Sequence, residues 1–235
     1  MSDPIIELEL YLVRHGESRS NAGLQDPGDL RAFQDPFLSE KGLRQAQLLG
    51  EFYSRLELDC ILSSGQNRAL QTAGEVAKRQ RRANSVEAHP IFTECCLPTA
   101  FGEKRFDEIA ERHPCAVPAQ GVDRADNFVL TQDDPDDETR MARAREAVDY
   151  LRNRFHSGEK VMVAAHAQFN TFLHFAALGL SAHEKFDFAI ANTGVSKFLF
   201  FKEGTGRWGA DVHLIFHNSL AHLAGEFPDV IFTAV

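Results

Sequence analysis

Near its start the chain reads Leu8-Glu9-Leu10-Tyr11-Leu12-Val13-Arg14-His15-Gly16, a short apolar run that ends in charged and polar residues. Such a run is typical of a buried β-strand, and it predicts that Arg14 and His15 lie at the carboxyl end of that strand. Residues 160–165 repeat the pattern and lead directly to His166. The sequence therefore predicts two buried strands, each of which delivers a histidine to the end of a sheet.

Helical patterns alternate with strand patterns along the rest of the chain. Ser39 is a candidate helix N-cap, and Ser63 and Ser64 are candidate caps of a second helix. The expected helices are 39–56, a segment that closes with the basic run at 78–82, 136–155 and 169–178, and the further expected strands are 59–62, 86–92, 195–201 and 212–216. This alternation predicts an α/β fold, a three-layer α/β/α sandwich with a mainly parallel central sheet.

Residues 97–135 are the least regular part of the chain and contain four prolines. Acidic residues concentrate near the end of this part, where 123–138 holds seven of them against Arg124, a net charge of −6. We interpret 97–135 as a cap-like insertion over the active site, with a short helix near 104–112. The remainder of 1–235 is expected to form a single domain around it.

The chain as a whole has 25 Lys and Arg against 34 Asp and Glu, a net charge of −9. This balance repels nucleic acids and anionic membranes, so we expect neither as a partner. A small anionic substrate is still allowed, because a few cations can make one pocket positive. The basic run at 78–82 fits a solvated helix end or an RNA patch, and the helix end is favoured because cations are stabilising there.

The four cysteines, Cys60, Cys95, Cys96 and Cys115, have neither zinc-site nor redox-motif spacing. The adjacent pair Cys95-Cys96 is either redox-active or a pair of small buried hydrophobic residues, and we favour the second interpretation. The first residues carry acids instead of the basic start of a signal peptide, and no apolar run reaches transmembrane length. We expect a reduced, soluble, cytoplasmic protein.

Cations gather at the predicted strand ends. Arg14 and His15 follow the first strand, Arg68 lies one turn beyond the second, and His166 ends a later one. A cation in the first turn of a helix opposes the helix dipole, so the position of Arg68 indicates a bound anion. Phosphate fits best, since guanidinium groups bind its oxygens in pairs. No phosphate-loop motif or paired-aspartate metal pattern is present at these positions, so we predict a side-chain nucleophile without metal or cofactor.

Motifs around these positions occur in a fixed order that spans about residues 8–201. They are Tyr11-Leu12-Val13-Arg14-His15-Gly16-Glu17-Ser18 with Asn21, Leu38-Ser39-Glu40-Lys41-Gly42-Leu43-Arg44-Gln45-Ala46, Ser63-Ser64-Gly65-Gln66-Asn67-Arg68-Ala69-Leu70-Gln71-Thr72-Ala73, Glu94, and Val163-Ala164-Ala165-His166. The set closely resembles the signature of the histidine phosphatase superfamily, whose members include cofactor-dependent phosphoglycerate mutases and fructose-2,6-bisphosphatase. The ordered set carries the resemblance, since a single Arg-His-Gly is weak.

The resemblance implies a role for each matching residue. It makes His15 the nucleophile that takes the phosphoryl group, which agrees with the reactivity of an unprotonated imidazole near neutral pH. Glu94 would protonate the leaving alkoxide and later take a proton from water, with Glu103 as a nearby competitor for this role. The implied phosphate ligands are Arg14, Arg68, His166, Asn21 and, through its backbone amide, Ala167.

The sequence departs from the family pattern after the second histidine. The family commonly has glycine there, whereas this chain has Ala167-Gln168-Phe169, and we expect Gln168 and Phe169 to narrow the mouth of the pocket. The acid-phosphatase and phytase branch usually continues its first motif toward R-x-P and has aspartate after the second histidine. Neither feature is present, which disfavours that branch.

The combined reading predicts metal-independent hydrolysis of a phosphomonoester, a small phosphorylated metabolite or an aryl phosphate, through a phosphohistidine. A cofactor-dependent phosphoglycerate mutase is the main alternative, disfavoured because 97–135 lacks the Arg- and Tyr-rich insertion of mutase members. A catalytically silent phospho-ligand-binding or scaffold module is the alternative of another class. Residues expected around the rest of the substrate are the cations Arg19, Arg31, Lys104 and Arg105 and the aromatics Phe33, Phe37, Phe101 and Phe106.

The chain ends in an apolar tail at 227–235. This tail either completes the core or covers a partner, which leaves a homodimer open.

Overall fold

A computed structural model describes residues 3–24, 32, 34–95, 102–130, 136–182 and 186–227. Its centre is a seven-stranded sheet in the order β4-β3-β2-β5-β1-β6-β7. The strands are β1 (Ile6–Arg14), β2 (Cys60–Ser63), β3 (Val86–Ala88), β4 (Ala116–Pro118), β5 (Glu159–Ala165), β6 (Val195–Phe201) and β7 (Val212–Ser219). The five strands from β4 to β1 are mutually parallel, and β6 and β7 continue the sheet in antiparallel fashion. The predicted mainly parallel sheet is confirmed.

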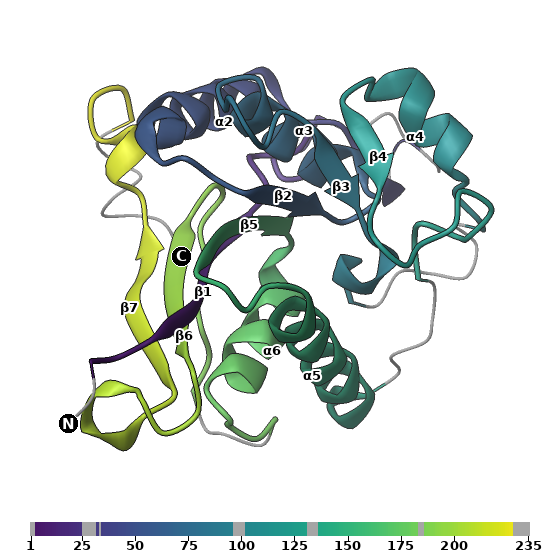
Figure 1. The fold of residues 1–235 in the computed structure, drawn as a ribbon. Coiled ribbons are helices and arrows are strands. Elements are labelled where there is room, and N and C mark those ends of the chain that lie inside the picture. Colours follow the sequence, from purple (N-terminus) through teal and green to yellow (C-terminus); the bar gives the residue numbers. More distant parts are fainter. Residues whose placement is uncertain are drawn as a thin grey trace.

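Helices cover both faces of this sheet (Figure 1). On one face lie α2 (Glu40–Phe52) and α3 (Asn67–Ala77), and on the other lie α5 (Asp137–Arg154) and α6 (Ala167–Ala177). The short helix α4 (Phe106–Arg112) lies beside the β3–β4 edge. The three-layer arrangement expected from the alternating patterns is therefore present.

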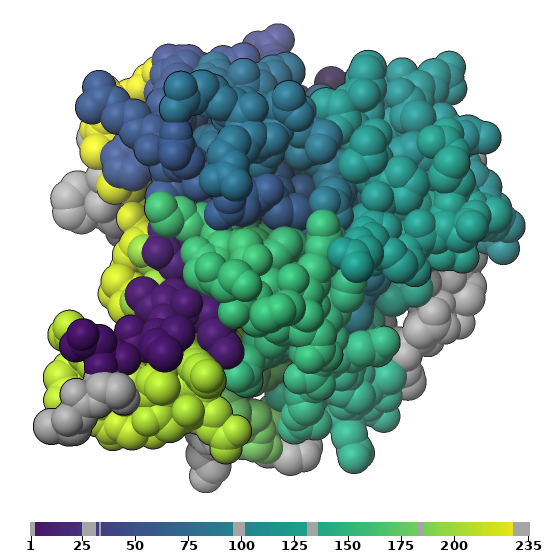
Figure 2. Space-filling view, viewed as in Figure 1, coloured from purple at the N-terminus to yellow at the C-terminus, as the bar shows by residue number. Residues whose placement is uncertain are grey.

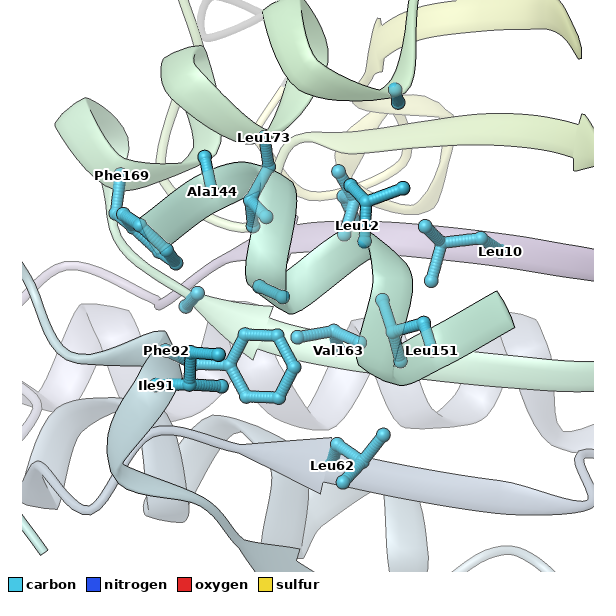
Figure 3. Packing of buried hydrophobic residues seen from close by; sticks show 14 of the residues in the cluster. Leu10, Leu12, Leu62, Ile91, Phe92, Ala144, Leu151, Val163, Phe169 and Leu173 are labelled. Carbon is cyan, nitrogen blue, oxygen red and sulfur yellow. The ribbon is translucent and has the colours of Figure 1, made fainter. Parts of the chain in front are cut away.

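The side chains of β1 alternate between the two helical layers, as a strand with both faces buried requires. Leu10 and Leu12 join the cluster formed with α5 and α6, which Figure 3 shows around Leu151 and Leu173. The neighbouring Val13 belongs to the cluster on the opposite face, with α2 and α3. This double burial fixes the strand, and with it the position of the residues that follow.

The loop after β1 packs very closely on the start of α2. A Cβ atom added to Gly42 would lie 1.8 Å from the carbonyl oxygen of Glu17, so only glycine allows this approach. Ser39 caps the helix as expected, since its Oγ accepts a hydrogen bond from the Gly42 N–H over 3.0 Å. The start of α2 thus supports the segment that follows His15.

Two expected element boundaries were wrong. The strand expected at 86–92 stops at Ala88, because Pro90 has no N–H for a ladder and instead opens a 3₁₀ helix, Pro90–Phe92. The second helix is not capped by Ser63 or Ser64: α3 begins at Asn67 and its N-cap residue is Gln66. Ser64 has a different partner, described below.

The segment interpreted as a cap-like insertion contributes to the sheet. Ala116–Pro118 forms β4 and pairs in parallel with β3, so this part of 97–135 is an edge strand instead of a cap. The short helix expected near 104–112 is present as α4. Residues 97–101 and 131–135, with the acidic pair Asp133 and Asp134, lie outside the described residues.

The basic run after α3 is an ion-paired helix end. Lys78 and Arg79 bind Glu75, and Arg79 also binds Glu51. The two following arginines are paired as well, Arg81 with Glu57 and Arg82 with Asp59. This arrangement agrees with a solvated helix end.

The N-terminal strand lies beside the hairpin formed by β6 and β7. In the space-filling view the purple N-terminal residues contact the yellow-green residues of that hairpin (Figure 2), in agreement with the antiparallel β1–β6 pairing.

Cys95 is buried, whereas Cys96 and residues 228–235 of the apolar tail lie outside the described part of the chain. Among the described helices, none combines the length and apolarity needed to span a membrane.

Candidate active site

Two histidines meet where β1 and β5 end. The parallel register pairs Arg14 with Ala165, so the next residue of each strand, His15 and His166, emerges at the same edge of the sheet. Their ring centroids are 5.2 Å apart, and both side chains are buried. The prediction that both histidines reach one edge is confirmed.

The imidazole of His15 is held in one tautomer. Its Nδ1–H donates to the carbonyl oxygen of Gly16 over 2.7 Å, and its Nε2 accepts a hydrogen bond from Nε–H of Arg68 over 3.1 Å. Burial, together with the charges of Arg68 and Arg14, holds the pKa of His15 well below its usual value of 6.5. His15 is therefore neutral near pH 7, with the lone pair on Nε2.

Arg68 is a buried cation in the first turn of α3. Burial lowers its pKa, and the negative charges of Asp35 and Glu94 act in the opposite direction. The carboxylate of Asp35 accepts the Asn67 N–H over 2.7 Å and so occupies the start of the helix. Since it also pairs with Lys104, Asp35 only partly balances the charge of Arg68, and an anion would stabilise this end of the helix.

Arg14 approaches the same space from the end of β1. Its Nη1 donates to the carbonyl oxygen of Ile190 over 2.7 Å, while its buried Nε has no hydrogen-bond partner among the described residues. Burial lowers the pKa of Arg14, and the charge of Glu94 opposes that shift. A buried guanidinium with an unused donor is ready to bind an oxyanion.

His166 is the N-cap residue of α6 and is fully buried. Its Nε2 lies 2.7 Å from Oγ of Ser64, and its Nδ1 has no hydrogen-bond partner in the described part of the chain. Burial and the nearby charge of Arg68 hold the pKa of His166 well below its usual value, with smaller contributions from His15, Arg14 and Arg143. A neutral His166 thus has one nitrogen fixed by Ser64 and one available to a ligand.

Glu94 is tied to the helix that His166 opens. Its Oε1 accepts hydrogen bonds from the backbone N–H groups of Cys95 (2.9 Å) and Phe169 (3.0 Å). Its charge opposes the lowering of the pKa of Arg14 and Arg68 that burial causes. Glu94 therefore lies near both predicted phosphate ligands. The competing Glu103 is exposed and is paired with Arg105, which favours Glu94 as the acid.

Asn21 and Ala167 complete the predicted set. Oδ1 of Asn21 accepts from Ser18 N–H (3.2 Å) and from Nδ2 of Asn192 (3.4 Å). The same Asn192 amide donates to the carbonyl oxygen of His15, which links Asn21 to the histidine. Ala167 is the first residue of α6, where backbone N–H groups have no acceptor within the helix.

A cavity of about 780 Å³ adjoins these groups. Of the candidate site residues, Arg14, Asn21 and Ala167 line it, and α6 adds Gln168, Thr171, Phe172 and Phe175 to the lining. The expectation that Phe169 narrows the mouth was wrong: its side chain is fully buried beneath the Arg143 guanidinium, 3.9 Å from the ring centroid, because position 169 of the helix faces the core.

Two of the cations expected around the rest of the substrate, Lys104 and Arg105, are held in ion pairs. Lys104 is buried, and its Nζ lies 2.6 Å from Oδ2 of Asp35, so it is a structural ion pair and not a free substrate ligand. Arg105 pairs with Glu103 on the surface, and Arg19 is exposed. Arg31 lies outside the described residues.

The described aromatic residues of that set, Phe37 and Phe106, do not line the cavity either. Phe106 is fully buried in the core, and Phe37 packs on His113 with ring centroids 6.2 Å apart. Phe33 and Phe101 lie outside the described residues. The rings that line the cavity are instead Phe172, Phe175, Phe186 and Phe188. Sequence reasoning missed them, although the three-residue spacing of Phe169, Phe172 and Phe175 was a signal.

Across the described residues, no group of three or more His, Cys, Asp or Glu side chains is placed to hold a metal ion. Those residues form a neutral histidine whose Nε2 lone pair accepts a hydrogen bond from buried Arg68, beside partly buried Arg14 and a carboxylate. Such a set can transfer a phosphoryl group to nitrogen.

Comparisons with known proteins identify the fold and the family of this chain. Phosphoserine phosphatase 1 of Hydrogenobacter thermophilus is 44% identical over 71 residues, which cover 30% of this chain and 32% of that protein. The matched stretch thus spans about a third of that relative. A phosphoserine phosphatase mutant of Entamoeba histolytica solved with phosphoserine superposes with a TM-score of 0.59 at 20% identity, covering 92% of this chain and 99% of that one.

A phosphoglycerate mutase from Bacillus anthracis shares the fold as well, with a TM-score of 0.60, 19% identity and coverage of 95% of this chain and 96% of that one. The model of the histidine phosphatase superfamily (branch 1) matches residues 10–208, a range that contains the whole predicted site. The chain belongs to the histidine phosphatase superfamily.

Proposed function

We propose that the protein is a phosphomonoester hydrolase that works through a phosphohistidine on His15. The observation that carries the proposal is the neutral ring of His15, whose Nε2 lone pair faces the Nε–H of buried Arg68 and which lies near the charge of partly buried Arg14. A phosphate dianion would compensate both guanidinium groups, and it would also draw the Nε–H of Arg68 away from the nucleophile.

The first half of the reaction transfers the phosphoryl group to the protein. The Nε2 lone pair of His15 forms a bond to phosphorus while the ester P–O bond breaks and its electron pair leaves on the alkoxide oxygen. The carboxyl group of Glu94 gives its proton to that oxygen, so a neutral alcohol departs. Arg14, Arg68 and His166 hold the non-bridging oxygens, where charge accumulates.

The second half returns the protein to its starting state. The Glu94 carboxylate takes a proton from water, and the water oxygen attacks phosphorus as the P–N bond to His15 breaks. The electron pair of that bond returns to Nε2, and inorganic phosphate leaves. Both halves use the same residues, so no further group is needed for turnover.

Hydrolysis is favoured over the mutase alternative by the charges that line the cavity. A mutase must hold a second phosphate while a bisphosphate reorients, which requires a second cluster of cations. Among the described lining residues the cation besides Arg14 is Lys41, which is already paired with Glu17 at 2.9 Å, and the carboxylate of Asp187 lines the cavity too. This balance supports one phosphate group per substrate.

The experiment that tests the proposal is a panel of phosphorylated metabolites and a chromogenic phosphate ester, assayed with wild type and His15→Ala. We expect phosphate release by the wild type, none by the variant, and no effect of EDTA. Turnover retained in His15→Ala would contradict the mechanism. Rapid formation of 2-phosphoglycerate from 3-phosphoglycerate and 2,3-bisphosphoglycerate would instead support the mutase, and binding without turnover would support the silent module.

The remaining sequence-based expectations stay proposals. They are a cytoplasmic location, a small phosphorylated substrate without nucleic-acid or membrane partners, and an open choice between monomer and homodimer.

A further inference from the structure

We infer that the preferred substrate is a phosphate monoester whose organic part is aromatic and carries no second anionic group. This inference rests on the proposed function, because it concerns the cavity that continues from the phosphate ligands.

Part of the wall of that cavity, which also contains polar residues such as Gln45, Gln168 and Asn192, is a cluster of phenylalanine rings, Phe172, Phe175, Phe186 and Phe188, which we call the Phe wall. Phe175, Phe186 and Phe188 contact one another edge to face, with centroid separations of 5.4 to 5.8 Å. Phe172 adds a further edge contact to Phe175 at 6.5 Å. Mutual edge-to-face contacts hold the rings in place and leave them able to receive another aromatic group.

One ring of the Phe wall is unusually exposed. Phe186 has 52% of its surface accessible to solvent, whereas Phe172 and Phe175 are almost fully buried. An apolar group bound in the cavity would remove part of the Phe186 surface from water, which is favourable in proportion to the area covered. The exposed ring thus indicates a ligand with an apolar face.

The charges around the Phe wall argue against a second anion on the substrate. Lys41 pairs with Glu17 and Asp137 pairs with Arg140, so the lining acid that is left without an ion pair among the described residues is Asp187. A substrate carboxylate or a second phosphate would lie near this acidic lining. Among the described lining residues, Arg14 is the cation without an ion pair, and the first phosphate already binds it. Like charges in one pocket repel and select against such substrates.

The size of the cavity fits this class of substrate. At about 780 Å³ it lies in the upper part of the range of roughly 300–1,000 Å³ typical of small-molecule sites. Arg14 lines the same cavity as the Phe wall, so one molecule can place its phosphate on the arginine and its ring on the phenylalanines.

The test compares esters with matched leaving groups, so that binding and not intrinsic reactivity is measured. We expect kcat/KM for 2-phenylethyl phosphate to exceed that for ethyl phosphate by about 10- to 100-fold, the effect of burying one phenyl group. The kcat/KM values for O-phosphoserine and 3-phosphoglycerate should be lower than the value for 2-phenylethyl phosphate. Equal values for the two matched esters, or preference for a carboxylated ester, would overturn the inference.

The variant Phe186→Ala tests whether the Phe186 ring causes the preference for 2-phenylethyl phosphate. We expect the ratio of kcat/KM between the two matched esters to fall toward one, because the ring that the substrate covers is gone. Phe52→Ala is the matched control, since Phe52 is 54% exposed at the end of α2 and does not line the cavity. An unchanged ratio in a folded Phe186→Ala protein, verified by its melting temperature, would also overturn the inference.

The experiment separates this inference from the function on which it rests. If no ester releases phosphate, the proposed function fails. If both matched esters are hydrolysed equally well, the hydrolase proposal stands and only the substrate class is wrong.

Discussion

Arg68 donates its Nε–H to Nε2 of His15 over 3.1 Å. The same contact fixes the ring with its lone pair toward the phosphate site and places a positive charge against it, which keeps the ring neutral. A buried arginine therefore positions the proposed nucleophile before substrate binds. When phosphate enters, its oxygens become better partners for the guanidinium than the imidazole is.

Replacement of Arg68 by lysine should be costly despite the retained charge. Lysine lacks the planar fork that can bind a phosphate oxygen and align His15 together. We expect Arg68→Lys to lower kcat/KM about 10²- to 10³-fold, the usual cost of losing one preorganised donor. Steady-state kinetics checks this, and Arg79→Lys on the surface end of α3 is the control. A loss smaller than about threefold in Arg68→Lys would refute the positioning role.

Ser64 should set the tautomer of His166. Its Oγ accepts the Gln66 N–H over 3.2 Å, so its own hydrogen is left for Nε2 of His166, and Nδ1 then carries the proton toward the ligand. We expect Ser64→Ala to lower kcat/KM about 10-fold and Ser64→Thr to restore most of it. Nitrogen NMR of the imidazole should report Nδ1–H in the wild type. Observation of the Nε2–H tautomer would show that Ser64 accepts instead.

The role of Glu94 predicts a dependence on the leaving group. Glu94→Gln cannot donate a proton, so we expect a loss of about 10²- to 10⁴-fold with ethyl phosphate. With 4-nitrophenyl phosphate the first step should be affected much less, since nitrophenolate leaves without protonation. The comparison of the two esters measures this, with Glu103→Gln as the control. Equal losses for both esters would remove Glu94 from the acid role.

The buried histidines predict a loss of stability in acid. Burial lowers the pKa of His113, His174 and His222 to about 4, whereas the unfolded chain titrates near 6.5. Between these values the unfolded state binds more protons, so the free energy of unfolding falls as the pH drops. Each group contributes up to about 1.4 kcal/mol per pH unit.

Urea unfolding between about pH 7 and about pH 4 checks this expectation. His222→Gln should reduce the slope of the free energy of unfolding against pH by the contribution of one proton. Glutamine keeps a donor for Thr193 but does not titrate. A flat stability profile over this interval would mean that these histidines are accessible to protons in the folded protein.

The elements that could be predicted are those with long, regular patterns. The apolar runs of β1 and β5 defined the sheet and brought His15 and His166 to one edge, while the ordered motifs identified Arg14, Arg68 and Glu94. The three-residue strand β4 is too short to show a period, so its segment was read as a cap.

Errors in the substrate pocket have a different cause. Lys104 was expected at the substrate, but its partner Asp35 lies 69 residues earlier, and such a pairing leaves no local pattern. Phe186 and Phe188 lie in an irregular segment between α6 and β6, and only the fold brings them beside Phe172 and Phe175. Motifs thus predicted the candidate catalytic residues, while the residues that line the cavity required the three-dimensional structure.

The most direct test of the account is to trap the phosphorylated protein. Wild type and Glu94→Gln are mixed with 4-nitrophenyl phosphate, quenched within the first turnover and analysed by peptide mass spectrometry under alkaline conditions, where phosphohistidine survives. We predict one phosphoryl group on His15 that accumulates in Glu94→Gln, because the water-activating carboxylate is missing, and none in His15→Asn. Turnover without a phosphoryl group on His15, or a phosphoryl group on another residue, would contradict the account.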